Sequence, residues 1–395
     1  MTNRKKVLFL TNILSPYMHE FFDHLTKYDE IDFKVAACIK NEPDRAWNTD
    51  YLNDAKYNYE IMRDTILVKI PFQNRFFYLG GLSLLRDIIF GGYSAVIFKG
   101  GTRFIGPFYA IISRLLGKRT ILWEEDNLSG TNLLKKLIKP FYINKLVFSE
   151  FIALGAKVKD FLETMISNEN NEIYYTYYTI NNDKFRQRYL QIKNKKNLAK
   201  KALGIDAKKK IILCIARFIN DKNLFTFIDA IGELKKQDNN FTCLLIGNGH
   251  LDSKIRKYIA YKGLRDVLTL VPFKQFKKLT YYYLISDVFA LPSKIEPWGL
   301  VVNEAMIFDL PVIVSDKVGC GDDLVQDGYN GYVFPYKDHV ALASKIKQVL
   351  SNPEKLGQNS YNIIKDKNFD HVSKTIIAAS KGLDNSFELT AKQSV

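Results

Sequence analysis

The sequence has few cysteines and no long apolar run. Its 395 residues include 4 cysteines, none with the Cys-x-x-Cys spacing of zinc sites or redox motifs. They fall in different, mostly strand-like segments, so we expect reduced, buried thiols. The run Val7–Leu10 is too short for the core of a signal peptide, and no segment approaches the length of a membrane-spanning helix. We therefore expect a cytoplasmic protein that meets a membrane only peripherally, at its inner face.

Acidic side chains are outnumbered by basic ones, and the formal net charge is +15. Such a charge attracts an anionic membrane surface, a sugar diphosphate or nucleic acid. Zinc-finger spacings and aromatic-basic RNA signatures are both missing, so nucleic acid is not an expected partner. The local cluster Lys135, Lys136 and Lys139 is typical of a solvated helix face, and a membrane anchor is the alternative.

The length predicts two domains, because single cores rarely grow beyond about 250–300 residues. In both halves, apolar strand-like runs alternate with segments of helical periodicity, which predicts an α/β protein with two doubly wound parallel sheets. The predicted domains cover residues 1–180 and 181–365, with a terminal segment over 366–395. A polar stretch from residue 175 to 197 is the predicted linker. The expected strands are Lys6–Thr11, Phe33–Cys38, Ile66–Ile70, Ala95–Phe98, Thr120–Trp123, Lys145–Phe148, Ile173–Tyr175, Ile211–Ala216, Phe241–Ile246, Val267–Leu270, Val288–Leu291 and Val312–Val314.

The stretch Pro292–Ser315 combines a loop with a helix start. Pro297 disfavours the α region for Glu296, and Gly299 gives the next turn backbone freedom. Helical spacing begins directly after that glycine, which places Glu296 before a helix N-terminus and Glu304 one turn inside the helix. Free amide groups at such an N-terminus suit a phosphate, and neighbouring carboxylates suit sugar hydroxyls. Solvated helix charges are the plainer interpretation of the two glutamates.

Several short motifs occur together in the order of a known family. In sequence they are Ile215-Ala216-Arg217-Phe218, Asp221-Lys222-Asn223, Leu244 to Gly249, Pro292-Ser293 with Glu296 and Glu304, Pro311-Val312-Ile313, Val318-Gly319 and Asp327 to Gly331. Together they resemble the nucleotide-sugar-binding domain of retaining family-4 glycosyltransferases, with an E-x7-E motif. The close resemblance covers about half of the chain. It implies the GT-B fold, two facing Rossmann-like domains with a cleft between them, and a C-terminal helix near His371 to Leu383 that returns to the first domain.

The resemblance also implies residue roles on the donor side. Arg217 and Lys222 would bind the donor diphosphate and stabilise it as a leaving group, without a metal ion or other cofactor. Glu296 would contact hydroxyls of the donor sugar, and Glu304 the ribose. Surface cations are the plainer interpretation of the two basic residues. Further donor contacts are expected from the backbone amides of Trp298, Gly299 and Leu300, and from Asn248 and Gly249.

The acceptor side is expected at the carboxyl ends of strands in the first half, where ligands of such sheets bind. Many relatives carry a histidine after the fourth strand, but this chain has Glu124, Glu125 and Asp126 there. One of them is expected to orient or deprotonate an acceptor hydroxyl, with Glu125 as our candidate. A helix N-terminal acidic cluster is the alternative. The other acceptor-side candidates are Ser15, His19 and Gly100, although a cap or surface role suits His19 equally well.

The implied activity is that of a retaining, metal-independent hexosyl- or deoxyhexosyltransferase. Its partners would be a nucleoside-diphosphate-sugar donor and a glycan or lipid-linked acceptor, in bacterial surface polysaccharide or lipopolysaccharide assembly. The alternatives are a non-catalytic nucleotide-sugar binder and a nucleotide-sugar epimerase. An epimerase would show a glycine fingerprint after the first strand, which does not follow Thr11 here. Its Tyr-x-x-x-Lys spacing occurs at Tyr189, Tyr258 and Tyr361, as expected by chance in a chain rich in tyrosine and lysine.

Overall fold

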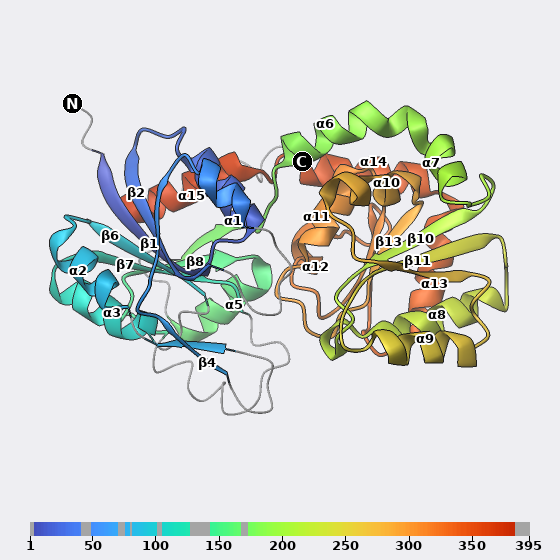
Figure 1. Ribbon diagram of the computed structural model, residues 1–395, viewed down its shortest axis with the longest axis horizontal. Helices are drawn as coiled ribbons and strands as arrows, with labels where there is room; N and C mark the ends of the chain where they lie inside the picture. The colour runs from blue at the N-terminus through green and yellow to red at the C-terminus, as the bar shows by residue number, and fades with distance from the viewer. Residues whose placement is uncertain are drawn as a thin grey trace. The chain divides into compact units, whose positions relative to one another are not determined.

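The computed structural model describes residues 4–40, 49–69, 76–79, 81–100, 105–126, 143–166 and 173–383. The chain forms two compact units (Figure 1). Unit 1 contains residues 1–178 and the C-terminal segment from residue 369, and unit 2 contains residues 179–368. The cluster Lys135, Lys136 and Lys139 lies outside the described residues. In the described part of the chain, no helix is both long and apolar enough to cross a membrane.

Unit 1 is built on a seven-stranded parallel sheet with the order β3-β2-β1-β6-β7-β8-β9. Its strands are β1 (Lys5–Ile13), β2 (Ile31–Ile39), β3 (Asn58–Ile61), β6 (Ala95–Lys99), β7 (Arg119–Glu124), β8 (Glu150–Leu154) and β9 (Ile173–Thr176). Its helices are α1 (Pro16–Leu25), α2 (Leu82–Phe90), α3 (Ile105–Leu115), α5 (Ala156–Met165) and α15 (Phe369–Lys381), with a short 3-10 turn η1 (Asp50–Asp54). The central strands are buried on both faces, which explains why they are continuous apolar runs.

One strand prediction in unit 1 is confirmed as a strand but lies outside the parallel sheet, and another is wrong. Ile66–Ile70 corresponds to β4 (Ile66–Lys69), which pairs with β5 (Phe76–Leu79) in a separate antiparallel ribbon. The stretch Lys145–Phe148 is a turn, because the Asn144 side chain accepts from the amides of Leu146 (3.0 Å) and Val147 (3.1 Å). An asparagine that bonds its own following backbone favours a turn over a strand.

Unit 2 is built on a six-stranded parallel sheet with the order β12-β11-β10-β13-β14-β15. Its strands are β10 (Lys210–Ile215), β11 (Phe241–Gly247), β12 (Leu268–Pro272), β13 (Val288–Leu291), β14 (Val312–Ser315) and β15 (Gly331–Phe334). Its helices are α6 (Asn182–Ile192), α7 (Lys196–Ala202), α8 (Leu224–Lys235), α9 (Asp252–Tyr261), α10 (Phe276–Ile285), α11 (Leu300–Ile307), α12 (Gly321–Leu324), α13 (His339–Ser351) and α14 (Pro353–Ile364). Two short 3-10 turns, η2 (Lys193–Lys195) and η3 (Asn220–Lys222), complete the unit.

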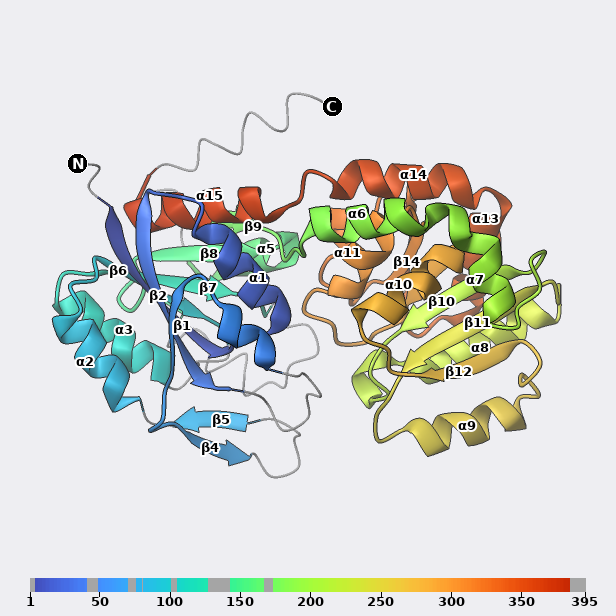
Figure 2. The ribbon, with the colours of Figure 1, turned by 45° about the horizontal axis from the view of Figure 1, so that its top comes forward.

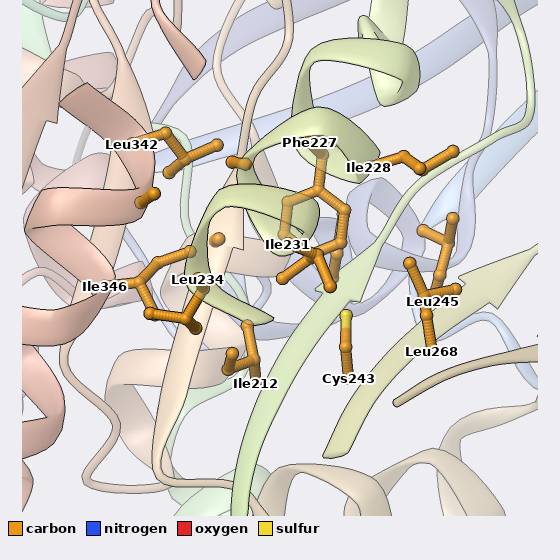
Figure 3. Close-up of a cluster of buried hydrophobic side chains, with 14 of the residues drawn as sticks. Ile212, Phe227, Ile228, Ile231, Leu234, Cys243, Leu245, Leu268, Leu342 and Ile346 are labelled. Carbon is orange, nitrogen blue, oxygen red and sulfur yellow. The ribbon is translucent and has the colours of Figure 1, made fainter. Parts of the chain in front are cut away.

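The core of unit 2 lies between its sheet and the helices α8 and α13. Figure 3 shows Phe227 and Ile231 of α8 over Ile212 and Cys243 of the sheet, all of them buried. All four cysteines of the chain are buried and free, as predicted. Burial raises the pKa of the Cys214 thiol, so that thiol stays protonated at neutral pH.

The predicted polar linker, residues 175–197, contains the boundary between the two units, but it is not irregular, because most of it forms α6 and the start of α7. Asn181 caps α6 by accepting from the amide of Lys184 (3.0 Å), and Phe185 is buried. Arg186 pairs with Asp309 (2.6 Å) and stacks on Tyr361, with 3.6 Å to the ring centroid. The arginine therefore contributes to packing, although its charge favoured the prediction of a solvent-exposed linker.

Helix α15 returns to unit 1 and packs against α1 (Figure 2). Phe369 contacts Phe21 with ring centroids 5.7 Å apart. Asp370 accepts a hydrogen bond from the Tyr28 hydroxyl (2.6 Å) and lies 2.8 Å from Nε2 of His24. The hydrogen bond from Tyr28 holds the pKa of the Asp370 carboxyl below its ordinary value, although burial opposes the shift. The carboxylate therefore stabilises the docking of α15.

Asp370→Asn is expected to lower the free energy of unfolding by at most about 1 kcal/mol at pH 7, because the carboxylate is partly exposed. A depressed folded pKa stabilises the protein above the unfolded value of 3.8 and loses that contribution as the pH falls through the folded pKa. Urea unfolding of the wild type and of Asp370→Asn should show a difference in the free energy of unfolding at pH 7 that disappears below pH 3.8. An equal difference at both pH values would contradict a role for the charge.

Candidate functional site

The donor-side candidates of unit 2 gather on loops at the carboxyl ends of three neighbouring strands. Arg217 follows β10, Asn248 and Gly249 follow β11, and the loop with Glu296 follows β13. Since β10 pairs with both β11 and β13, the three loops leave the same edge of the sheet side by side. In doubly wound sheets this edge is where ligands bind.

An ion pair joins two of these loops. Nζ of Lys222, at the end of η3, lies 2.5 Å from Oε2 of Glu296, and the Ser293 hydroxyl donates to the same oxygen over 3.1 Å. The two charged side chains are only 12% and 14% exposed. The carbonyl of Asp221 accepts from the amides of Lys294 (2.9 Å) and Ile295 (3.2 Å), which fixes the backbones to each other. A cation and a carboxylate are thus held in place before any ligand arrives.

The loop from Glu296 to the start of α11 depends on its glycine. Gly299 has φ +102°, and a Cβ there would lie 3.0 Å from a methyl group of Leu291. The carbonyl of Glu296 accepts from the amide of Gly319 (2.8 Å), which pins the loop to the segment after β14. Gly299 is also the N-cap of α11 and has no side chain to accept from the first-turn amides. The amides of Gly299 and Leu300 therefore lie at a helix start of the kind that suits an anion.

Trp298 and Glu304 are anchored inside unit 2. Trp298 is buried and donates from Nε1 to Oδ1 of Asn303 (2.9 Å). Glu304 is buried in α11 and accepts from the hydroxyl of Tyr283 in α10 (2.7 Å). The sequence reasoning missed Tyr283 because it lies in a run of three tyrosines. Helical phase does not separate it from its neighbour, since Tyr282 is buried in α10 as well.

The Gly-x-Gly motif after β11 has a structural reason of its own. The amide of Phe218 donates to the carbonyl of Asn248 (2.6 Å), so the two strand ends approach closely. A Cβ on Gly249 would collide with the Phe218 carbonyl, whereas the side chain of Asn248 is exposed. Arg217 lies beside this contact and is half-buried. The motif thus places Arg217 and Asn248 at adjoining strand ends.

In unit 1, a buried lysine outside the predicted site residues organises the carboxyl edge of the sheet. Nζ of Lys99, at the end of β6, lies 2.8 Å from Oε2 of Glu125 and 3.4 Å from the Tyr178 hydroxyl. It also lies over the rings of Trp123 and Tyr178, at 5.5 Å and 5.0 Å from their centroids. Burial disfavours the ammonium ion, but Glu125 and Tyr178 outweigh burial and raise the pKa of Lys99. The sequence signal that could have identified Lys99 is a charged residue at the end of a buried strand.

The acidic candidates after β7 have different environments. Glu124 is buried, and its carboxylate accepts from the amides of Glu125 (3.1 Å) and Asp126 (2.8 Å). Glu125 pairs with Lys99 and approaches Gly100, where a Cβ would lie 3.0 Å from its Cγ. Glu124 therefore shapes the turn, whereas Glu125 is held by a fixed cation.

Ser15 and His19 lie at the start of α1. The Ser15 hydroxyl caps the helix by accepting from the amide of Met18 (3.3 Å). His19 is buried, with Nδ1 3.4 Å from the Tyr57 hydroxyl and its ring 5.2 Å from that of Tyr51. Ser15 is therefore the N-cap of α1, and His19 is buried inside the helix, so the cap and surface alternatives for His19 are both wrong.

Residues 195–366 match the family model of glycosyl transferases group 1. The match covers less than half of the chain and lies within unit 2, where it contains every donor-side candidate. The finer assignment to family 4 and to its E-x7-E motif stays a prediction.

Curated glycosyltransferases are similar to parts of this chain. The alpha-D-kanosaminyltransferase of Streptomyces kanamyceticus is 27% identical over 144 residues, 36% of this chain and 37% of that protein. The amylovoran biosynthesis glycosyltransferase AmsK of Erwinia amylovora is 33% identical over 139 residues, 34% of each chain. The similarity thus spans about a third of these two relatives. MJ1178 of Methanocaldococcus jannaschii, an uncharacterized glycosyltransferase, is 26% identical over 334 residues, 74% of this chain and 92% of that one.

Solved glycosyltransferase structures share the fold. Anabaena Alr3699/HepE in complex with UDP superposes with a TM-score of 0.73 and 16% identity, over 96% of this chain and all of that one. A glycosyltransferase from Rickettsia africae gives the same score and identity, with 96% and 98% covered. WaaG, a glycosyltransferase involved in lipopolysaccharide biosynthesis, gives 0.66 at 13% identity, with 95% and 100% covered. These similarities confirm the GT-B fold class and its two Rossmann-like domains.

Proposed function

We propose that this protein is a retaining glycosyltransferase that moves a hexosyl or deoxyhexosyl group from a nucleoside-diphosphate-sugar to a hydroxyl of a glycan or glycolipid. The observation that carries the proposal is the Lys222–Glu296 pair (2.5 Å) at the carboxyl edge of the sheet in unit 2. This edge lies in the segment that matches glycosyl transferases group 1. The alpha-monoglucosyldiacylglycerol synthase of Acholeplasma laidlawii, 31% identical over 164 residues, 41% of this chain and 40% of that one, supports a glycolipid among the acceptor classes.

On the donor side, Arg217 and Lys222 neutralise the diphosphate as it leaves. Fixed cations stabilise the charge that develops on the phosphate, so no metal ion is required in this scheme. Glu296, held by Lys222 and Ser293, contacts hydroxyls of the transferred sugar. Glu304 contacts the ribose. The helix start at Trp298, Gly299 and Leu300 supplies amide donors, and Asn248 and Gly249 lie beside the phosphates or ribose.

The proposed reaction is a displacement on one face of the sugar. The acceptor oxygen bonds to the anomeric carbon on the face from which the phosphate departs. The bond from that carbon to the phosphate oxygen breaks, and the acceptor proton passes to the departing phosphate. This route preserves the anomeric configuration without a protein nucleophile, for which the sequence offers no convincing candidate.

Unit 1 is proposed to bind the acceptor. Glu125 is the strongest of the acidic candidates, because Lys99 fixes its carboxylate whereas that of Glu124 is used by turn amides. Asp126, Gly100, Ser15 and His19 are further acceptor-side candidates. We assign the protein to bacterial surface polysaccharide or lipopolysaccharide assembly, at the inner face of the membrane.

The test begins with thermal unfolding in the presence of UDP, GDP, dTDP and ADP. One of them should raise the melting temperature by several degrees, since a ligand at 100 times its Kd adds about 2.7 kcal/mol. Arg217→Ala should abolish the shift. With the matching sugar donor and an acceptor, the enzyme should release nucleoside diphosphate, keep the anomeric configuration and tolerate a chelator. Indifference to all four nucleotides would contradict the donor site, and binding without transfer would favour a non-catalytic binder.

A further inference from the structure

Helices α2 and α3 lie side by side over one face of the seven-stranded sheet (Figures 1 and 2). Their inner residues, among them Leu84, Ile88 and Ala110, are buried in the core of unit 1. Near the start of α3, the Tyr109 hydroxyl donates to the carbonyl of Gly81, the N-cap of α2 (2.9 Å). The two helices therefore begin next to each other, and their outer surfaces form one continuous face.

This outer surface, which we call the α2–α3 face, is apolar where a surface helix is normally polar. Phe90 and Leu115, near the ends of the two helices, are 80% and 82% exposed, and Leu82 is 74% exposed. An exposed apolar patch of several hundred Å² usually marks an interaction surface. The exposed apolar residues of the face are Leu82, Ile89 and Phe90 in α2, Phe108, Ile111 and Leu115 in α3, and Leu116 directly after α3.

The exposed charged side chains of the two helices are both basic. Arg86 of α2 and Arg114 of α3 are exposed. Asp87 is the acidic residue of α2, and it is occupied by Lys34, with 2.6 Å between Oδ2 and Nζ. The sequence of α3 contains no acidic residue. The face thus combines large apolar side chains with arginines whose charge is not balanced by neighbouring carboxylates of the two helices.

We propose that the α2–α3 face docks the protein on an anionic membrane surface. Side chains such as Phe90 and Leu115 enter the boundary between headgroups and acyl chains, as the apolar face of an interfacial helix does. Arg86 and Arg114 then contact lipid phosphates, each adding to the attraction. The inference is independent of sugar transfer, since it uses no residue of the proposed donor or acceptor site.

A second copy of this chain is a poorer occupant of the face. In a two-fold symmetric dimer the same patch meets itself. Arg86 and Arg114 would then be brought toward their own counterparts and desolvated without acidic partners on either helix, which disfavours association. An anionic bilayer satisfies both the apolar and the basic side chains.

The test is co-sedimentation with vesicles made of equal parts of phosphatidylglycerol and phosphatidylcholine. The wild type should bind them at low salt and bind phosphatidylcholine vesicles much less. Phe90→Ser/Leu115→Ser should weaken binding at least about tenfold, since each serine removes a side chain that inserts. Arg86→Gln/Arg114→Gln should weaken it about tenfold on the anionic vesicles alone.

The matched control is Leu198→Ser in α7 of unit 2, where the leucine is 66% exposed. This variant should bind vesicles like the wild type, and circular dichroism should show that all variants are folded. Light scattering tests the alternative occupant: a wild-type dimer that Phe90→Ser/Leu115→Ser converts to a monomer would overturn the proposal. Failure of the wild type to bind anionic vesicles, or equal loss in the Leu198→Ser control, would overturn it as well.

Discussion

Lys222→Met is expected to lower kcat by about 10²–10³-fold, the usual effect of removing one fixed group that stabilises developing charge. The ammonium group lies 2.5 Å from Glu296 at the sheet edge, and both side chains are largely buried. Methionine keeps most of the volume of the lysine stem but has no charge to offer the departing diphosphate. The measurement is steady-state release of nucleoside diphosphate, with the donor identified in the nucleotide screen.

A structural role for the pair makes a different prediction. Breaking a buried ion pair leaves an uncompensated charge and costs up to about 3–5 kcal/mol, so Lys222→Met alone mixes stability with catalysis. The double variant Lys222→Met/Glu296→Leu removes that charge. It should unfold at a temperature closer to that of the wild type and still be inactive. Recovery of activity together with stability would show that the pair only holds the loops.

A matched control lies in the same unit. Lys235, the last residue of α8, pairs with Asp266 over 2.7 Å, and the aspartate side chain is 60% exposed. Lys235→Met should leave kcat unchanged and alter the free energy of unfolding by less than about 1 kcal/mol. A comparable loss of activity in this variant would mean that the effect at Lys222 reflects a general loss of lysine charge.

Four strands of unit 2, β10, β11, β13 and β14, could be predicted from the sequence because they are buried on both faces. Val288–Leu291 has the predicted bounds, and Phe241–Ile246 is one residue short of β11. A strand covered on both sides is a continuous apolar run, which periodicity identifies directly. Local side-chain chemistry overrode that signal at Lys145–Phe148, where Asn144 forms a turn. In α6 the sequence is polar and shows no regular period, but its polar residues pack against other helices and the segment is helical.

The candidate site was predictable only in its local part. The Pro-Trp-Gly sequence indicated that Glu296 precedes a helix and that Glu304 lies inside it, as the structure shows. The cation that pairs with Glu296 could not be predicted in the same way, because Lys222 lies 74 residues away along the chain. Likewise, Lys99 meets Glu125 only because β6 and β7 are neighbours in the sheet. Such contacts depend on topology, which periodicity does not encode.

Glu304→Ala is expected to weaken binding of the nucleoside diphosphate about 10–100-fold, since a hydrogen bond to a charged group contributes about 1.5–3 kcal/mol. The carboxylate is buried, and its Oε2 accepts from Tyr283. In the proposed donor complex the carboxylate also accepts from the ribose hydroxyls. Isothermal titration should compare the preferred nucleotide with its 2′,3′-dideoxy analogue. The wild type should distinguish the two ligands, and Glu304→Ala should bind both equally.

Tyr283→Phe separates the ribose contact from the packing of Glu304. It removes the hydroxyl that donates to Oε2 but keeps the carboxylate, so it should cost about 1–3 kcal/mol of stability as a buried acceptor loses its donor. Preference for the ribose ligand over the dideoxy analogue should persist in this variant, because the group that recognises ribose is still present. If Glu304→Ala kept the same preference, the carboxylate would serve only to join α10 and α11 through Tyr283, and ribose recognition would have to lie elsewhere on the edge of the sheet.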